Sequence, residues 1–307
     1  MNNVLSIGEC MLQLREERKG KFAQSFGGDS LNTAIYLSRL GIETSYLTAL
    51  GDDRWSDEMV AVWKKEGVNT SLVRRVPGRM PGLYIIQNDS DGERNFSYWR
   101  DQSPAREIFE NDEPSLAQSF LQHDRIYFTG ITLSLYSAEG RIRLFDYLQR
   151  ANDAGAWIIF DTNFRNAGWP DRREADRAFR QAIEMADVLF ASFEDMSAIF
   201  GKAAEAMFNV AKSAEKVLKL PDASARLVWR NRDEVVAPLP VKKIIDTTAA
   251  GDSFAAGYLA ARIKGKSPLI AAAAGHQLAN VVIQHPGAII PRSKMPKSLM
   301  KMKHEQT

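Results

Sequence analysis

The segment 246–257 carries the residue pattern with the clearest chemistry in the chain, and it reads Asp-Thr-Thr-Ala-Ala-Gly-Asp-Ser-Phe-Ala-Ala-Gly. Asp252 follows three small residues, Ala249, Ala250 and Gly251, and Ser253 opens an apolar, helix-like run. A turn of small residues that leads into a helix gathers unpaired backbone N–H groups at the positive end of the helix dipole. Such a site favours an anion.

The carboxylate of Asp252 would repel a phosphate that merely bound at this site. It has a chemical use if it accepts a proton from a hydroxyl that attacks a phosphoryl group, while the N–H groups of residues 249–252 stabilise the charge on that group. The segment therefore predicts a kinase with Asp252 as the general base. The alternative is structural, with Asp252 or Ser253 capping the helix.

A second motif, Phe-Gly-Gly-Asp-Ser-Leu-Asn at residues 26–32, precedes the first long helical pattern. Its two glycines permit a close backbone approach, and Asp29 and Asn32 lie about one helical turn apart. We expect both side chains to face a ligand with several hydroxyl groups. Here the alternative is a turn in which Asp29 or Ser30 caps the helix.

Composition narrows the class of protein. Of the 307 residues, 45% are hydrophobic and 25% are charged, which is ordinary for a globular protein. The net charge of +2 is close to neutral and argues against a broad positive surface that would bind nucleic acid. Cys10 is the single cysteine, so an intrachain disulfide is excluded and a reducing compartment fits. We find no signal-peptide pattern at the N-terminus and no apolar run of ~20 residues. We therefore expect a cytoplasmic protein that binds neither nucleic acid nor membrane.

Strand and helix patterns alternate along most of the chain. Strands are predicted at 4–7, 45–50, 126–129, 157–160, 188–191, 217–220, 226–230, 234–237 and 241–245. Helices are predicted at 30–40, 57–66, 138–153, 173–185, 194–200, 204–214, 252–263 and 268–283. This order predicts an α/β fold with a mostly parallel sheet covered on both faces. Two hairpin segments, at approximately 10–25 and 76–103 with a turn at 88–92, should form a β-lid over the carboxyl edge of the sheet. The lysine-rich tail at 293–307 is expected to be solvated.

The sequence resembles the ribokinase-like (PfkB-type) carbohydrate kinases along nearly its whole length, and within them the 2-keto-3-deoxygluconate kinases. The matching text comprises residues 246–257, 8–11, 27–32, 81–84, 92–94, 98–100, 160–165 and 287–292. The resemblance implies a single ribokinase-like domain over 1–307, with a three-layer α/β/α fold, a mostly parallel central sheet and a small β-lid. It also implies ATP-dependent phosphorylation of 2-keto-3-deoxygluconate on its 6-hydroxyl, with Mg²⁺ and in some relatives K⁺.

The resemblance also assigns roles to individual residues. Gly28, Asp29 and Asn32 would meet the sugar hydroxyls. Tyr84, Tyr98, Arg100 and Arg165 would surround the acid end, which agrees with the strong hydrogen bonds that guanidinium groups give to carboxylates. Asn163, Lys219, Gly251 and Asn280 would contact the nucleotide. Asp246 would contribute to a monovalent-cation site or, as the alternative, stabilise a turn. Arg165 could instead contact the phosphates.

Two departures from the family pattern concern the nucleotide side. Met196 stands where many relatives carry a glutamate that organises magnesium, so that Glu194 or Asp195 would have to replace it from nearby. Pro221 stands in a turn that is glycine-rich in relatives. These departures favour the alternative of a non-catalytic sugar-acid-binding protein. A fructokinase-like kinase of a neutral ketose is a separate alternative. The family resemblance also implies a homo-oligomer that associates through the β-lid.

Overall fold

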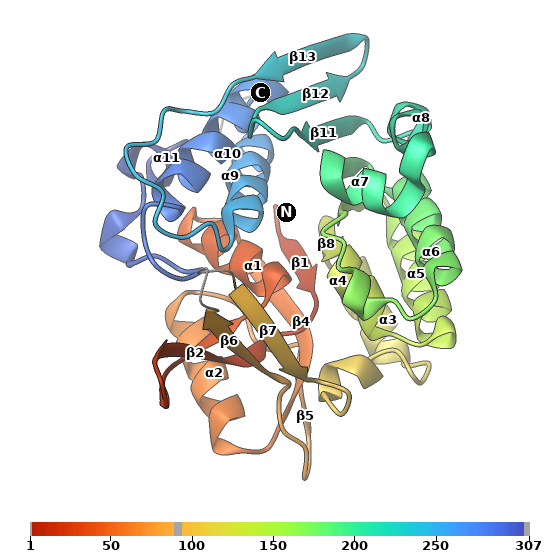
Figure 1. The fold of residues 1–307 in the computed structure, drawn as a ribbon. Helices are drawn as coiled ribbons and strands as arrows, with labels where there is room; N and C mark the ends of the chain where they lie inside the picture. The colour runs from red at the N-terminus through yellow and green to blue at the C-terminus, as the bar shows by residue number, and fades with distance from the viewer. Residues whose placement is uncertain (1, 89–93, 304–307) are drawn as a thin grey trace.

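The computed structural model describes residues 2–88 and 94–303. The turn predicted at 88–92 lies almost wholly outside these ranges. Within them, nine strands form one sheet in the order β13-β12-β11-β10-β9-β8-β1-β4-β5 (Figure 1). The strands are β1 (Val4–Ile7), β4 (Thr44–Gly51), β5 (Val73–Val76), β8 (Arg125–Thr129), β9 (Trp157–Asp161), β10 (Val188–Ser192), β11 (Glu215–Lys219), β12 (Ala225–Trp229) and β13 (Arg232–Val236). Neighbours pair in parallel from β5 to β11, and β12 and β13 add an antiparallel hairpin at the edge.

Helices cover both faces of this sheet, with α9 and α10 on one side and α5, α6 and α7 on the other (Figure 1). The helices are α1 (Asp29–Arg39), α2 (Arg54–Lys65), α3 (Pro114–Leu121), α4 (Gly130–Leu135), α5 (Ala138–Asp153), α6 (Arg172–Met185), α7 (Phe193–Phe200), α8 (Ala204–Val210), α9 (Ala250–Ile263), α10 (Pro268–Val282) and α11 (Lys297–Met300). In β8, Ile126 and Phe128 enter the core under α3 and α5, whereas Tyr127 enters the core under α1 and α9. This period of two gives the sheet two apolar faces and the molecule three layers.

A second, four-stranded sheet makes the lid, in the order β3-β2-β6-β7. Its strands are β2 (Met11–Arg18), β3 (Lys21–Gly27), β6 (Leu83–Asn88) and β7 (Arg94–Trp99). The two predicted hairpin segments thus share one sheet, because β2 and β6 pair in parallel. Met11, Tyr84 and Ile86 form a small buried cluster on one face of the lid.

The predicted strand at 241–245 is wrong. This segment is an irregular loop in which Ile244 is 60% exposed, and the N–H of Ile245 donates to the carbonyl oxygen of Ile283 beyond α10. Pro238 and Pro240 lack N–H groups where the chain leaves β13, so the loop does not continue a ladder.

Other boundaries differ by smaller amounts. The predicted helix 204–214 ends at Val210, and β11 begins two residues before its predicted start. The sequence patterns missed α3, α4 and β5, of which β5 is an edge strand with two arginines among its four residues.

The C-terminal segment was predicted to be solvated, but part of it is buried. Its lysines are exposed, but Met295 and Leu299 are buried against the core formed by α9 and α10. In the part of the chain that the structure describes, every helix is too short or too polar to cross a bilayer.

Candidate active site

One cavity of about 1050 Å³ lies between the carboxyl edge of the central sheet, the lid and the first turn of α9. Ligands bind at this edge in open α/β sheets. The cavity brings together most of the predicted site residues, namely Gly28, Asp29, Asn32, Tyr84, Tyr98, Arg100, Asn163, Arg165, Lys219, Ala249, Ala250, Gly251 and Asp252. These come from lid strands, strand ends and two helix starts that are remote in sequence.

Asp252 lies in the first turn of α9 with its side chain on the cavity wall. Its Oδ2 accepts a hydrogen bond of 2.8 Å from Nδ2 of Asn32. The helix cap is Ala249, which makes no side-chain hydrogen bond, so the alternative role of Asp252 as a helix cap does not hold. The carboxyl group therefore faces the site where a ligand would bind.

The surroundings of Asp252 raise its pKa to about 7. Burial is the largest cause, and the negative charges of Asp29 and Asp161 add to it, while the Asn32 hydrogen bond and the Lys219 ammonium oppose it. A base is most useful when its pKa lies near the working pH, because it then takes up a proton readily while about half of the molecules are still in the ionised form. Asp252 is thus chemically suited to accept a hydroxyl proton.

The start of α9 is shaped for an anion. Ala249 adopts a left-handed conformation with φ of 61°, and the helix begins at the next residue. The N–H of Ala250 already donates to a backbone carbonyl in the preceding turn, whereas the N–H groups of Gly251 and Asp252 have no carbonyl one turn earlier in the helix to bond. A Cβ atom on Gly251 would lie 3.3 Å from Nζ of Lys219, so the ammonium group stands beside these N–H groups. The N-terminal end of the helix dipole and the ammonium group of Lys219 thus both make the electrostatic potential positive at this point.

Asp29 connects three elements at the floor of the cavity. Its Oδ2 accepts hydrogen bonds of 2.7 Å from Oγ1 of Thr129, at the end of β8, and from Nδ2 of Asn163, just beyond β9. Asn163 has φ of 22°, a strained value for a residue with a side chain. Among the residues that the structure describes, Oδ1 of Asn32 is a buried acceptor with no hydrogen-bond partner, and a ligand donor could satisfy it.

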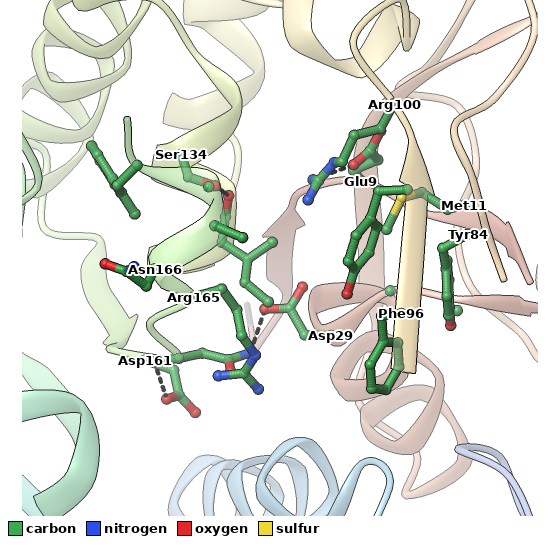
Figure 2. A pocket seen from close by; sticks show the side chains of 18 of the residues that line it. Glu9, Met11, Asp29, Tyr84, Phe96, Arg100, Ser134, Asp161, Arg165 and Asn166 are labelled. Carbon is green, nitrogen blue, oxygen red and sulfur yellow. Dashed lines mark hydrogen bonds and ion pairs between the residues drawn. The ribbon is translucent and has the colours of Figure 1, made fainter. Parts of the chain in front are cut away.

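The lid side of the cavity carries aromatic and guanidinium groups (Figure 2). Tyr84 is buried and donates its hydroxyl to Oε1 of Gln13, whereas Tyr98 is half exposed, with its ring centroid 5.8 Å from that of Tyr84. Arg100 forms an ion pair with Glu9. Arg165 lies across the cavity on the other wall, is exposed, and donates from Nη1 to the carbonyl oxygen of Phe164.

Comparison with known proteins gives the family. The model of the pfkB family of carbohydrate kinases matches residues 1–295. This chain belongs to that family. The 2-dehydro-3-deoxygluconokinase of Dickeya dadantii (strain 3937) is 40% identical over 307 residues, which covers 96% of this chain and 98% of the relative.

Solved structures of family members share the fold. The 2-dehydro-3-deoxygluconokinase of Thermotoga maritima superposes with a TM-score of 0.82 at 24% identity and covers 94% of both chains. The fructokinase of Xylella fastidiosa with bound ATP gives a TM-score of 0.81 at 22% identity and covers 98% of both chains. The predicted membership of the ribokinase-like carbohydrate kinases and the predicted α/β fold are confirmed.

The first departure from the family pattern is Met196, and of its two acidic neighbours Asp195 is the one that lies at the cavity. Met196 is 1% exposed and packs in the core, and Glu194 is exposed away from the cavity, whereas Asp195 lines it. Oδ2 of Asp195 accepts a hydrogen bond of 2.8 Å from Oγ1 of Thr162. Ser192 caps α7 by accepting from the N–H of Asp195, which fixes this residue in the first helical turn.

The second departure, Pro221, begins a tight turn between β11 and β12. The N–H of Leu220 bonds to the carbonyl of Ser224, and Ala223 takes the positive φ of 64°. The left-handed residue of this turn is therefore Ala223, two positions after the proline.

Asp161, at the end of β9, is a cavity residue that the sequence reasoning did not assign. Its carboxylate lies 3.3 Å from Nζ of Lys219. Burial raises the pKa of Asp161, Asp195 and Asp29 raise it further, and Lys219 opposes them. The available signal was an acidic residue at the carboxyl end of a buried strand, and Glu9, two residues beyond the end of β1, gave the same signal.

Two predicted site residues lie outside the main cavity. Nδ2 of Asn280 donates to the carbonyl oxygens of Leu239 and Pro240, so this residue supports the loop before α9. Asp246 accepts hydrogen bonds at Oδ1 from Thr248 and at Oδ2 from the N–H of Gly287. These contacts match its alternative role of stabilising a turn.

Proposed function

We propose that this chain transfers the terminal phosphoryl group of ATP to the 6-hydroxyl of 2-keto-3-deoxygluconate, also called 2-dehydro-3-deoxygluconate. The buried carboxyl group of Asp252, facing the cavity at the start of a helix, is the observation that carries the proposal. The activity for which the Dickeya dadantii relative is named supports the choice of substrate. ATP use is supported by membership of the family and by the ATP-bound fructokinase.

In this reaction Asp252 accepts the proton of the 6-hydroxyl as its oxygen attacks the γ-phosphorus of ATP, and ADP leaves. The N–H groups at the start of α9 and the ammonium group of Lys219 stabilise the charge on the transferring phosphoryl group. Asn32 holds Asp252 in place through its amide. The lid excludes water, which would otherwise hydrolyse ATP.

The residues present fit a magnesium ion bound largely through water. Asp161 and Asp195 both line the cavity, and carboxylate oxygens are ligands that Mg²⁺ and its bound water prefer. Among the described residues, no set of three or more His, Cys, Asp or Glu side chains is arranged to hold a metal by itself. Mg²⁺ supplies charge neutralisation at the phosphates when bound.

Recognition of an acid sugar would come from Arg100 on the lid side and Arg165 on the opposite wall. Both line the cavity, and the two side chains lie on opposite sides of Asp29 in Figure 2. Guanidinium groups form bidentate, charge-assisted hydrogen bonds with carboxylates, which a neutral ketose cannot match. Tyr84 and Tyr98 would pack against the carbon chain.

A kinase of a neutral ketose is the second candidate, and the ion pair of Arg100 with Glu9 favours it. A guanidinium that already has a carboxylate partner gives less net attraction to an anionic ligand.

Release of ADP, measured with a panel of purified sugars and sugar acids, tests the proposal. We expect kcat/KM for 2-keto-3-deoxygluconate to exceed that for fructose by about tenfold or more, the difference expected from one charge-assisted contact. Preference for fructose would establish the second candidate. Binding of the acid without ADP release would establish the non-catalytic sugar-acid-binding protein.

We also propose that two copies of the chain associate through their lids. On the lid face opposite the cavity, Leu83 pairs with Trp99 of β7, and Phe22 lies on the same face by register. Trp99, on the edge strand β7, is 58% exposed, and Phe22, on the opposite edge strand β3, is 43% exposed. Large apolar side chains exposed on one sheet face favour burial against a partner.

A further inference from the structure

Glu9 and Arg100 stand at the two ends of the lid. Glu9 lies between β1 and the first lid strand, and Arg100 directly follows the last lid strand. Their ion pair joins the point where the chain enters the lid to the point where it leaves. The Glu9 side chain is 1% exposed and that of Arg100 is 17% exposed, although both line the cavity (Figure 2).

This pair leaves two polar atoms unsatisfied. Oε2 of Glu9 contacts Arg100, but Oε1 of Glu9 and Nε of Arg100 are buried without a partner among the described residues. Buried polar atoms in folded proteins nearly always have partners, so an unmatched acceptor beside an unmatched donor points to a missing ligand. A Cβ atom at residue 82 would lie 3.0 Å from Oε1, and Gly82 keeps that space open.

The charges define what such a ligand must present. The carboxylate of Glu9 largely offsets the positive charge of Arg100, so a bare carboxylate group would be attracted to one residue and repelled by the other. A hydroxyl next to the ligand's carboxylate removes this conflict. It donates to Oε1 of Glu9, while the carboxylate accepts hydrogen bonds from Arg100.

We propose that Glu9 is a specificity-determining residue, which accepts a hydrogen bond from a hydroxyl on the carbon next to the ligand's carboxylate. The proposal deepens the proposed function and rests on its assignment of the acid end to Arg100. It extends recognition from the carboxylate alone to a carboxylate and hydroxyl on adjacent atoms. This combination occurs in 2-hydroxy acids and in ring-closed 2-keto acids.

The proposal selects one form of a 2-keto sugar acid. In the open chain, the carbon next to the carboxylate is a carbonyl and has no proton to donate to Glu9. When the 5-hydroxyl adds to this carbonyl, its proton passes to the former carbonyl oxygen, and the hemiketal gains the required hydroxyl. The 6-hydroxyl remains outside the five-membered ring, free to attack a phosphoryl group. Ring closure is thus compatible with the proposed reaction.

The test compares D-gluconate with 2-deoxy-D-gluconate, which differ only in the hydroxyl next to the carboxylate. Calorimetric titration of the wild-type protein should give a Kd for D-gluconate that is lower by about tenfold, as expected for a hydrogen bond to a charged group. In Glu9→Gln, which keeps the side-chain shape and loses the charge, this ratio should fall below about threefold. Glu113→Gln is the matched control, because Glu113 pairs with Arg74 outside the cavity.

Equal Kd values for the two acids in the wild-type protein, or no binding of D-gluconate while 2-keto-3-deoxygluconate binds, would overturn the proposal without any variant. An undiminished ratio in Glu9→Gln would overturn it as well. ADP release with 2-keto-3-deoxygluconate is measured in parallel. Failure of that assay would count against the proposed kinase activity, whereas the ratio of the two gluconates reports on Glu9 alone.

Discussion

At the scale of single residues, Asp252 shows how burial and neighbouring charge prepare a carboxyl group for acid–base chemistry. Its pKa of about 7 results first from burial and then from the nearby carboxylates of Asp29 and Asp161. The same carboxyl group on a solvated surface would be a weak base with a pKa near 3.8. Its position within the fold therefore accounts for the basicity that the proposed mechanism requires.

The first prediction concerns activity as a function of pH. Asp252 must be ionised to accept a proton, so kcat/KM should rise with pH through about 7 and level off above it. Initial rates of ADP release across about pH 5 to 9, at subsaturating sugar acid, measure this. A profile that is flat between pH 5 and 7 would show that Asp252 titrates at its ordinary value, and would contradict the claim that burial raises its pKa.

The second prediction concerns stability. The unfolded chain loses the Asp252 proton near pH 3.8, whereas the folded protein holds it until about pH 7. Between these values the folded state binds more protons, so the free energy of unfolding falls as pH rises. Asp252→Asn removes this loss and should increase the free energy of unfolding above pH 7 by on the order of 2 kcal/mol.

Urea unfolding of the wild-type protein and of Asp252→Asn at two pH values tests this second prediction. The advantage of the variant should be largest at high pH and should shrink as pH falls toward 4. A variant that is less stable than wild type at high pH would contradict it.

At the scale of elements, the turn between β11 and β12 offers a local test of backbone strain. Ala223 is exposed and holds φ of 64°, a conformation that glycine adopts at little cost. We expect Ala223→Gly to raise the free energy of unfolding by about 0.5–1 kcal/mol, because relief of strain exceeds the added chain entropy. The control is Ala61→Gly, since Ala61 is also exposed but lies inside helix α2, where glycine is less favourable than alanine. Thermal unfolding should show stabilisation by the first change and slight destabilisation by the second.

Much of this element order could be predicted because local patterns decide it. Apolar runs such as 126–129 mark buried parallel strands, and Gly41 and Gly67 mark helix ends at their positive φ values. The sequence patterns failed at segments whose structure depends on tertiary contacts. β5 is a short edge strand with arginines, and the apolar residues 244 and 245 remain exposed in a loop.

The site was predictable in its members and less so in its contacts. Asp252 and Asp29 could be predicted because they directly follow glycines at helix starts, and Asn32 because it lies about one helical turn after Asp29. The ion pair of Glu9 with Arg100 could not be predicted, because its partners lie 91 positions apart and meet only when the lid folds back on the sheet. The hydrogen bond from Asn163 to Asp29 spans 134 positions and was missed for the same reason.

At the scale of the whole molecule, the lid has two faces with different uses. One closes the cavity through Tyr84 and Tyr98, and the other presents Trp99 and Phe22 to solvent. If the second face joins two copies, Trp99→Lys should shift the protein from dimer to monomer in sedimentation experiments. Ile142→Lys, at a residue on α5 that is 68% exposed, should leave the assembly unchanged. A wild-type protein that is monomeric at every concentration would rule out association through the lid.

The central claim is that Asp252 takes the proton from the sugar hydroxyl during phosphoryl transfer. Its most direct test is the turnover of Asp252→Asn with ATP and 2-keto-3-deoxygluconate, alongside calorimetric binding of the same acid. The account predicts a loss of kcat of ~10²–10⁴-fold, as for removal of a general base, with affinity for the acid nearly unchanged. Turnover close to that of the wild-type protein would contradict it.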